Sequence, residues 1–109
     1  VSICADESFH DSSDLDEMKN KYDTINIKLD KTGGLSEALV IANEAKKLNL
    51  KIMLGCMVSS SLSMIPLLPL YQFADFIDLD GPCFISHDRE NGLSYEKGMI
   101  LLNRDLCWG

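Results

Sequence analysis

The sequence has little positive charge. Its 109 residues contain 10 Lys and Arg against 17 Asp and Glu, which gives a formal net charge of −7 at pH 7. Proteins that bind nucleic acid neutralise phosphates with clustered Lys and Arg side chains, and the sequence has no such cluster. We therefore expect no nucleic-acid partner.

Long apolar runs are also missing. The most apolar stretch, residues 64–71, is interrupted by Pro66 and Pro69, and it is far shorter than the roughly 20 residues of a membrane-spanning helix. We expect no membrane-embedded segment. The composition is otherwise that of a globular protein, with 46% hydrophobic and 25% charged residues, which is enough for one core.

Closely spaced cysteine pairs are absent as well. Cys4, Cys56, Cys83 and Cys107 lie far apart, and no two of them form a CxxC motif. Their number would allow a disulfide framework, but the chain already has segments that can form a core. We expect free and mostly buried thiols in a reducing cytoplasm.

The apolar pattern predicts four strands. Ile25, Ile27 and Leu29 alternate with polar residues, which makes residues 24–29 the clearest strand. Three further extended segments are predicted over residues 2–6, 51–56 and 76–80.

Helices are predicted between these strands. The first covers residues 13–22 with Ser13 as its cap, and the second runs from Gly33-Gly34 to about residue 48. The third covers residues 61–73, where Pro66 and Pro69 shorten or kink it. Beyond residue 82 the pattern changes to a short hairpin or tail, so we divide the chain into residues 1–81 and 82–109.

The element order is β-α-β-α-β-α-β followed by the tail, which indicates parallel strands with helical crossovers. A flavodoxin-like open sheet would share this order. Polar residues nevertheless fall at or near the C-terminal end of each strand, where (β/α)₈ barrels build their active sites. A lysine such as Lys28 is also poorly tolerated inside a doubly covered sheet. We therefore predict four parallel strands of a (β/α)₈ barrel.

Four motifs in this order resemble the enolase superfamily, and in particular its dipeptide epimerases. The motifs match the family's fifth to eighth barrel strands and are Ala5-Asp6-Glu7-Ser8, Asn26-Ile27-Lys28-Leu29-Asp30-Lys31-Thr32-Gly33-Gly34, Gly55-Cys56-Met57 and Asp78-Leu79-Asp80-Gly81-Pro82. Each motif is weak on its own, whereas the ordered set covers almost the whole chain.

The resemblance implies a role for each of these sites. It identifies Asp6 as a carboxylate ligand of Mg²⁺ and Lys28 as an acid/base catalyst. Asp78 and Asp80 would receive the ammonium group of an L-Ala-D/L-Glu-type dipeptide, next to Cys56 and Met57 as further substrate contacts. A divalent cation on the substrate carboxylate would stabilise the charge that forms when the α-proton leaves. The pKa of Lys28 would have to fall, as a nearby cation and partial burial both favour.

The same resemblance implies parts that these residues do not supply. In the family, two more metal carboxylates and a second lysine base come from earlier strands. We therefore expect a fragment of a longer polypeptide that is inactive by itself and holds no ordered Mg²⁺. Ser59 also stands where the family usually has a glutamate.

Two functions remain open at this stage. The first is the C-terminal part of a dipeptide epimerase, with muconate cycloisomerase or o-succinylbenzoate synthase activity as the nearest alternatives. The second is a catalytically silent half-barrel, expected to be a homo-oligomer because an unclosed sheet has two free edges and an open apolar face.

Several of these residues also have plainer interpretations. Asp6 could cap a loop, Asp78 and Asp80 could form a turn before Gly81-Pro82, and Lys31 is expected to be a solvated or supporting loop residue. His10 and His87 are expected at the surface.

Overall fold

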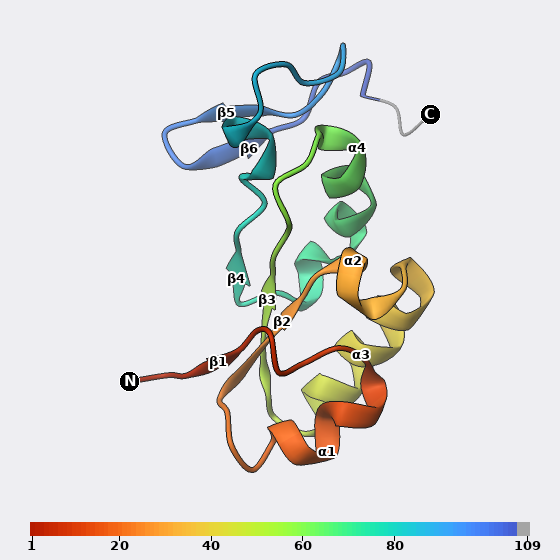
Figure 1. Cartoon of the computed structure of the whole chain (residues 1–109), viewed down its shortest axis with the longest axis vertical. Helices are drawn as coiled ribbons and strands as arrows, with labels where there is room; N and C mark the ends of the chain where they lie inside the picture. Colours follow the sequence, from red (N-terminus) through yellow and green to blue (C-terminus); the bar gives the residue numbers. More distant parts are fainter. Residues whose placement is uncertain (107–109) are drawn as a thin grey trace.

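A computed structural model describes residues 1–106 of the chain, and its core is a four-stranded parallel sheet (Figure 1). The strands lie in chain order and are β1 (Cys4–Ala5), β2 (Thr24–Ile27), β3 (Lys51–Leu54) and β4 (Phe76–Ile77). Each strand pairs in parallel with the next one along the chain. The sheet is the predicted four-strand portion of a (β/α)₈ barrel.

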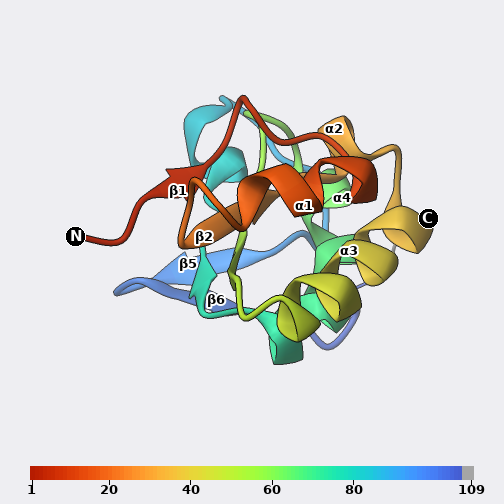
Figure 2. The same cartoon turned by 90° about the horizontal axis from the view of Figure 1, so that it is seen from below.

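The helices cover one face of this sheet (Figure 2). The longest, α3 (Leu35–Lys47), buries the apolar stripe Ala38, Ile41, Ala42 and Ala45. This stripe belongs to one core cluster with the alternating Ile25 and Ile27 of β2 and with Ile52 and Leu54 of β3. The 3.6-residue period of α3 and the two-residue period of the strands therefore meet at one interface.

The first predicted helix is shorter than expected. The segment forms a 3₁₀ turn, η1 (Ser12–Asp14), followed by α1 (Leu15–Met18). The cap is Asp11 rather than Ser13, because the Asp11 carboxylate accepts a hydrogen bond from the Ser13 N–H and Asp14 completes a capping box.

The third predicted helix is broken at its prolines. It begins as α4 (Ser61–Met64) and continues as the 3₁₀ helix η2 (Ile65–Phe73), which contains Pro69. Proline has no N–H to donate to an α-helical ladder, so the prediction of a shortened helix is confirmed.

The strands end earlier than the sequence pattern suggested. β2 stops at Ile27 because Lys28 and Leu29 lead into a one-turn helix, α2 (Leu29–Thr32), which ends at Gly33 with φ of 79°. β4 stops at Ile77, so Asp78 and Asp80 lie beyond the strand and before the 3₁₀ turn η3 (Gly81–Phe84).

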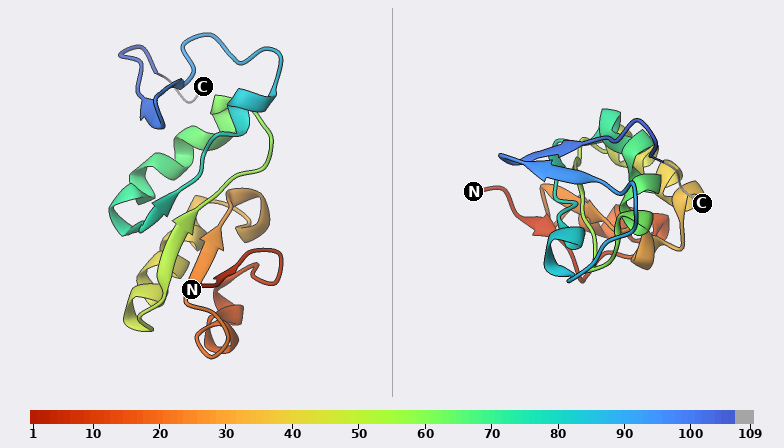
Figure 3. Two further views of the ribbon diagram at one scale, coloured as in Figure 1. Left: turned by 90° about the vertical axis from the view of Figure 1, so that its left-hand side faces the viewer. Right: turned by 90° about the horizontal axis from the view of Figure 1, so that it is seen from above.

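The C-terminal segment forms an antiparallel hairpin of β5 (Ser94–Glu96) and β6 (Met99–Leu101). Lys97 and Gly98 make its two-residue turn, both with positive φ (50° and 79°), which is the geometry of a tight hairpin. Figure 3 shows the hairpin at the end of the molecule toward which β3 runs.

The described cysteines Cys4, Cys56 and Cys83 are free thiols. The expectation that they are mostly buried is wrong, because Cys4 and Cys83 are exposed and Cys56 is partly buried; Cys107 lies outside the described residues. Within residues 1–106 no helix has both the length and the apolar character to cross a membrane.

Candidate functional site

Lys28 and Asp6 meet where two neighbouring strands end. Asp6 follows the last residue of β1 and Lys28 follows the last residue of β2. The Lys28 Nζ lies 3.0 Å from Oδ1 and 3.1 Å from Oδ2 of Asp6. Only 10% of the Lys28 side chain is exposed. Its ammonium group therefore points toward the strand ends and not outward to the helices.

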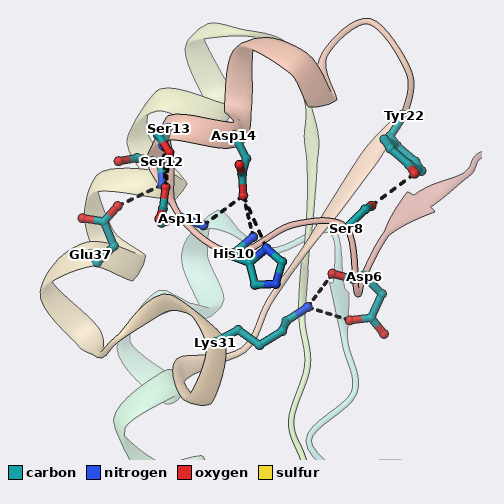
Figure 4. Close-up of polar contacts among 10 residues, drawn as sticks. All are labelled: Asp6, Ser8, His10, Asp11, Ser12, Ser13, Asp14, Tyr22, Lys31 and Glu37. Atoms are coloured by element: carbon teal, nitrogen blue, oxygen red, sulfur yellow. Dashed lines mark hydrogen bonds and ion pairs between the residues drawn. The ribbon is translucent and has the colours of Figure 1, made fainter.

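Lys31 reaches the same aspartate from α2 (Figure 4). Its Nζ lies 2.9 Å from Oδ1 of Asp6 and 2.5 Å from the Asp6 main-chain oxygen. Lys31 was expected to be either solvated or a supporting residue; its side chain is 8% exposed and bonded to Asp6, so the solvated alternative is wrong. No signal in the sequence indicated this contact, because it depends on the pairing of β1 with β2.

The two lysines control the charge of Asp6. Burial raises the pKa of this carboxyl, but hydrogen bonds and charge from Lys31 and Lys28 outweigh burial and hold the pKa below its usual value. Burial lowers the pKa of Lys28, yet Asp6 and the Glu7 carboxylate, 3.5 Å away, outweigh it and leave the pKa raised. The direction is opposite to the one expected for a base. The Asp6 and Glu7 charges both favour the ammonium form of Lys28.

Asp78 and Asp80 form a second charged group at the same end of the sheet. Both side chains are exposed. Burial raises the pKa of Asp78, as do the Asp80 charge and a hydrogen bond between the two carboxyl groups, while the Lys28 charge lowers it. The Lys28 charge therefore acts on Asp78. The two carboxylates repel each other, and a cationic group bound between them would neutralise this repulsion.

Cys56 and Met57 follow β3 and touch the segment that carries the acid pair. The Cys56 thiol donates to the main-chain oxygen of Asp78 at 3.4 Å. A Cβ at Gly81 would lie only 2.5 Å from the Met57 oxygen, so glycine allows these two loops to approach. Ser59, which replaces the expected glutamate, donates from its hydroxyl back to the Met57 oxygen at 3.2 Å.

Asn26 is a buried polar residue that the sequence pattern did not single out. It is 4% exposed, and its Oδ1 has no hydrogen-bond partner among the described residues. A Cβ at Gly55 would lie 2.2 Å from this oxygen. The small residue at the end of β3 therefore makes room for an amide beneath the Lys28–Asp6 pair.

The described residues contain no cluster of three or more His, Cys, Asp or Glu side chains that could hold a metal ion. Asp6 has the oxygen ligands that Mg²⁺ prefers, but one carboxylate is not a metal site. His10 and His87 are exposed, as expected.

The sequence matches a known family along almost its whole length. Residues 1–104 fit the model of the family described as enolase C-terminal domain-like. The chain is 44% identical over 109 residues to an N-acetyl-D-glutamate racemase from Pseudoalteromonas sp., covering 100% of this chain and 35% of the relative. It is 47% identical over 102 residues to the L-Ala-D/L-Glu epimerase of Escherichia coli K12, covering 94% of this chain and 32% of the relative. The chain thus spans about a third of these relatives.

Solved structures show the same relationship. An enolase family member from Agrobacterium tumefaciens with homology to dipeptide epimerases, crystallised with sodium and L-Ala-L-Glu, superposes with a TM-score of 0.89 and 51% identity over 95% of this chain and 32% of that one. A dipeptide epimerase from Cytophaga hutchinsonii, complexed with Mg and D-Ala-L-Val, gives a TM-score of 0.85 and 26% identity over 94% and 30%. The fold and the sequence together place the chain: it belongs to the enolase C-terminal domain-like family.

Proposed function

We propose that this chain is the part of a Mg²⁺-dependent dipeptide epimerase that supplies one proton-transfer lysine, one metal ligand and the ammonium site. The observation that carries the proposal is the Lys28–Asp6 pair at 3.0 Å, formed where two adjacent strands end. Relatives support the proposal as well, because an epimerase and a racemase match the chain over more than nine-tenths of its length.

Each residue has a defined task in this proposal. Lys28 moves the proton on the carbon next to the substrate carboxylate, because its ammonium group stands at the strand ends with little exposure. Asp6 provides one carboxylate to Mg²⁺, which when bound stabilises the negative charge that develops on the substrate. Cys56 and Met57 contact the substrate from the neighbouring loop.

The raised pKa of Lys28 gives Asp6 a second task. Asp6 and Glu7 now favour the protonated lysine. If the charge of Asp6 were taken up by a bound cation, the largest interaction that favours the ammonium form of Lys28 would be weakened and burial would lower the pKa of Lys28. Release of the Lys28 proton would then be easier. Metal binding and proton transfer are coupled through one carboxylate.

The acid pair selects the substrate class. The Asp80 charge helps to raise the pKa of Asp78, so two neighbouring carboxylates attract a cationic group, and the N-terminal ammonium of a dipeptide supplies one. An N-acetylated amino acid lacks that charge, and so do the substrates of the muconate cycloisomerase and o-succinylbenzoate synthase alternatives. We therefore favour a dipeptide over these substrates, although one relative carries the name N-acetyl-D-glutamate racemase.

A chimera tests the proposal. These 109 residues would replace the matching third of the E. coli L-Ala-D/L-Glu epimerase, and epimerisation would be followed with L-Ala-L-Glu and with N-acetyl-D-glutamate. The proposal expects turnover of the dipeptide in preference to the N-acetyl compound. Preference for N-acetyl-D-glutamate, or turnover of neither by a folded chimera, would contradict it. Asp78→Asn with Asp80→Asn should remove the preference, whereas the exposed Asp30→Asn should keep it.

A second candidate function is self-association of the chain. Among the described residues, β1 and β4 are the outer strands of the sheet and pair on one side only. Phe76 and Ile77 of β4 are 49% and 50% exposed. An apolar cavity of about 600 Å³ opens beside β4, lined by Tyr71, Ile77 and Met99 among others. Open strand edges and exposed apolar side chains favour a homodimer in which two copies cover each other.

A further inference from the structure

Hydrogen bonds hold the Asp78-Leu79-Asp80 segment, which follows the end of β4 at Ile77. One of them ties it to the sheet, because the Asp78 N–H donates to the Leu54 oxygen of β3 at 2.8 Å. Each main-chain oxygen of the segment also accepts one hydrogen bond. The donors are the Cys56 thiol for Asp78 at 3.4 Å, the Tyr95 hydroxyl for Leu79 at 2.7 Å and the Cys83 N–H for Asp80 at 2.8 Å.

The Tyr95 bond is the one that comes from the hairpin. Tyr95 is the middle residue of β5, paired with Ile100 of β6, and its ring packs against the core cluster. Burial raises the pKa of its hydroxyl, and the nearby thiols and carboxylates add to that effect. The hydroxyl therefore stays protonated and acts as a donor at neutral pH. Its acceptor residue, Leu79, is 2% exposed.

The hairpin that carries Tyr95 is itself fastened to the fold. The fully buried Ser61, first residue of α4, donates its N–H to the Asp88 carboxylate at 2.9 Å, and its hydroxyl also donates to Asp88. The same hydroxyl accepts the Leu93 N–H at 2.8 Å, two residues before Tyr95. A Cβ at Gly92 would lie 2.8 Å from the Ser61 Oγ. The absence of a side chain at Gly92 therefore allows the segment before β5 to pack closely against the start of α4.

We infer that Tyr95 is a positioning residue for the acid pair. The Leu79 carbonyl belongs to the peptide plane between Leu79 and Asp80. Fixing this plane sets the direction in which Asp80 leaves the chain relative to Asp78. The C-terminal hairpin thus contributes to the geometry of the strand ends, because it determines the distance between the two carboxylates. The consequence for substrate binding rests on the proposed function, whereas the effect on the acid pair does not.

Carboxyl ¹³C chemical shifts of Asp78 and Asp80 in the isolated chain test the positioning directly. Tyr95→Phe keeps the ring and removes only the donor, and it should move both shifts while leaving those of Asp6 in place. The matched control is Tyr22→Phe, which removes a hydroxyl that contacts Ser8 instead and should move neither the Asp78 nor the Asp80 shift. Unchanged Asp78 and Asp80 shifts in Tyr95→Phe would overturn the inference.

A second variant covers the case that Tyr95→Phe does not fold. Ser61→Ala removes the hydroxyl that contacts Asp88 and Leu93, leaves the main-chain N–H bond to Asp88, and keeps the Tyr95 hydroxyl. It should move the Asp78 and Asp80 shifts in the same direction by loosening the hairpin. A folded Ser61→Ala chain with wild-type shifts at both acids would contradict the inference.

The catalytic consequence is measured in the chimera with the E. coli epimerase. Tyr95→Phe should raise KM for L-Ala-L-Glu several-fold and change kcat little, because it disturbs the ammonium site and not the lysine. A fall in kcat at constant KM would count against positioning. If the unmodified chimera is inactive, the proposed function fails, while the chemical shifts still decide the role of Tyr95.

Discussion

Lys31 binds Asp6 at two different oxygens, one on the side chain at 2.9 Å and one on the main chain at 2.5 Å. Lys28 contacts only the carboxylate. Lys31 therefore fixes the backbone at the end of β1 as well as the position of the carboxylate, and its bond to the main chain does not depend on Lys28.

Lys31→Met should lower the free energy of unfolding. The lysine is 8% exposed and makes charge-assisted bonds, although Asp6 is 42% exposed and partly screened by water. We expect a loss of about 1 kcal/mol, at the lower end for hydrogen bonds to charged groups. Urea denaturation at one protein concentration measures it. Lys47→Met removes an exposed ion pair with Glu44 and should change the free energy of unfolding little. Equal losses of stability in the two variants would show that the Lys31 contacts with Asp6 stabilise the fold no more than a surface ion pair does.

Stability should fall in acid partly through Asp88. Burial raises the pKa of this carboxyl, but hydrogen bonds from Ser61 and the Arg89 N–H outweigh burial and keep the pKa below its ordinary 3.8. The unfolded chain then binds a proton before the folded chain does. The contribution of Asp88 is therefore present above the ordinary pKa and lost as pH falls through the lower, folded value.

Asp88→Asn should make the loss of stability at low pH less steep. Urea midpoints measured from pH 5 downward would decrease less steeply in Asp88→Asn than in the unmodified chain. Asp30→Asn, an exposed acid on α2, serves as the comparison. Parallel acid limbs for the unmodified chain and Asp88→Asn would mean that the Ser61–Asp88 contact does not form in solution.

Gly55→Ala should be destabilising because of one specific neighbour. The added Cβ would lie 2.2 Å from the Asn26 Oδ1 and 2.7 Å from its Nδ2. Overpacking of this kind costs about 1–3 kcal/mol. In the Asn26→Ala background the same change should cost much less, so the double-mutant cycle should show strong coupling. If the losses of stability in the two single variants simply add in the double variant, the cost of Gly55→Ala does not come from contact with Asn26.

The chain should self-associate at micromolar concentration. Light scattering is expected to give twice the 12.1 kDa of one chain. Ile77→Lys places a charge on the exposed edge of β4 and should weaken the association, whereas Val58→Lys, at a 65% exposed loop position, should not. A 12.1 kDa species at every concentration, with a cooperative melt, would contradict the self-association proposal.

Sequence patterns predicted those parts of the site that depend on strand order. Asp6 and Lys28 come directly after the last residues of β1 and β2, and parallel pairing brings strand ends together at one rim. The same reasoning was wrong about Asp78 and Asp80 as strand residues. Their segment lies past β4, and contacts with Cys56, Tyr95 and Cys83 determine its path. No local period in a sequence encodes such long-range bonds.

Lys31 and Asn26 show the same limit. A lysine in a loop motif normally faces water, and the sequence carries no sign that the main-chain oxygen of Asp6 will lie within reach. The amide of Asn26 alternates correctly with Ile25 and Ile27, but its burial depends on Gly55 of the neighbouring strand. Both residues owe their environment to packing between strands that are far apart in the chain.

In the proposed epimerase, Lys28 exchanges the proton on the carbon next to the substrate carboxylate. Solvent-deuterium incorporation into L-Ala-L-Glu by the chimera measures this step directly. Lys28→Met should reduce incorporation by at least about 100-fold, the usual range for loss of a general acid or base. Lys46→Met, at an exposed position in the last turn of α3, should leave it unchanged. Incorporation that survives Lys28→Met would contradict the account.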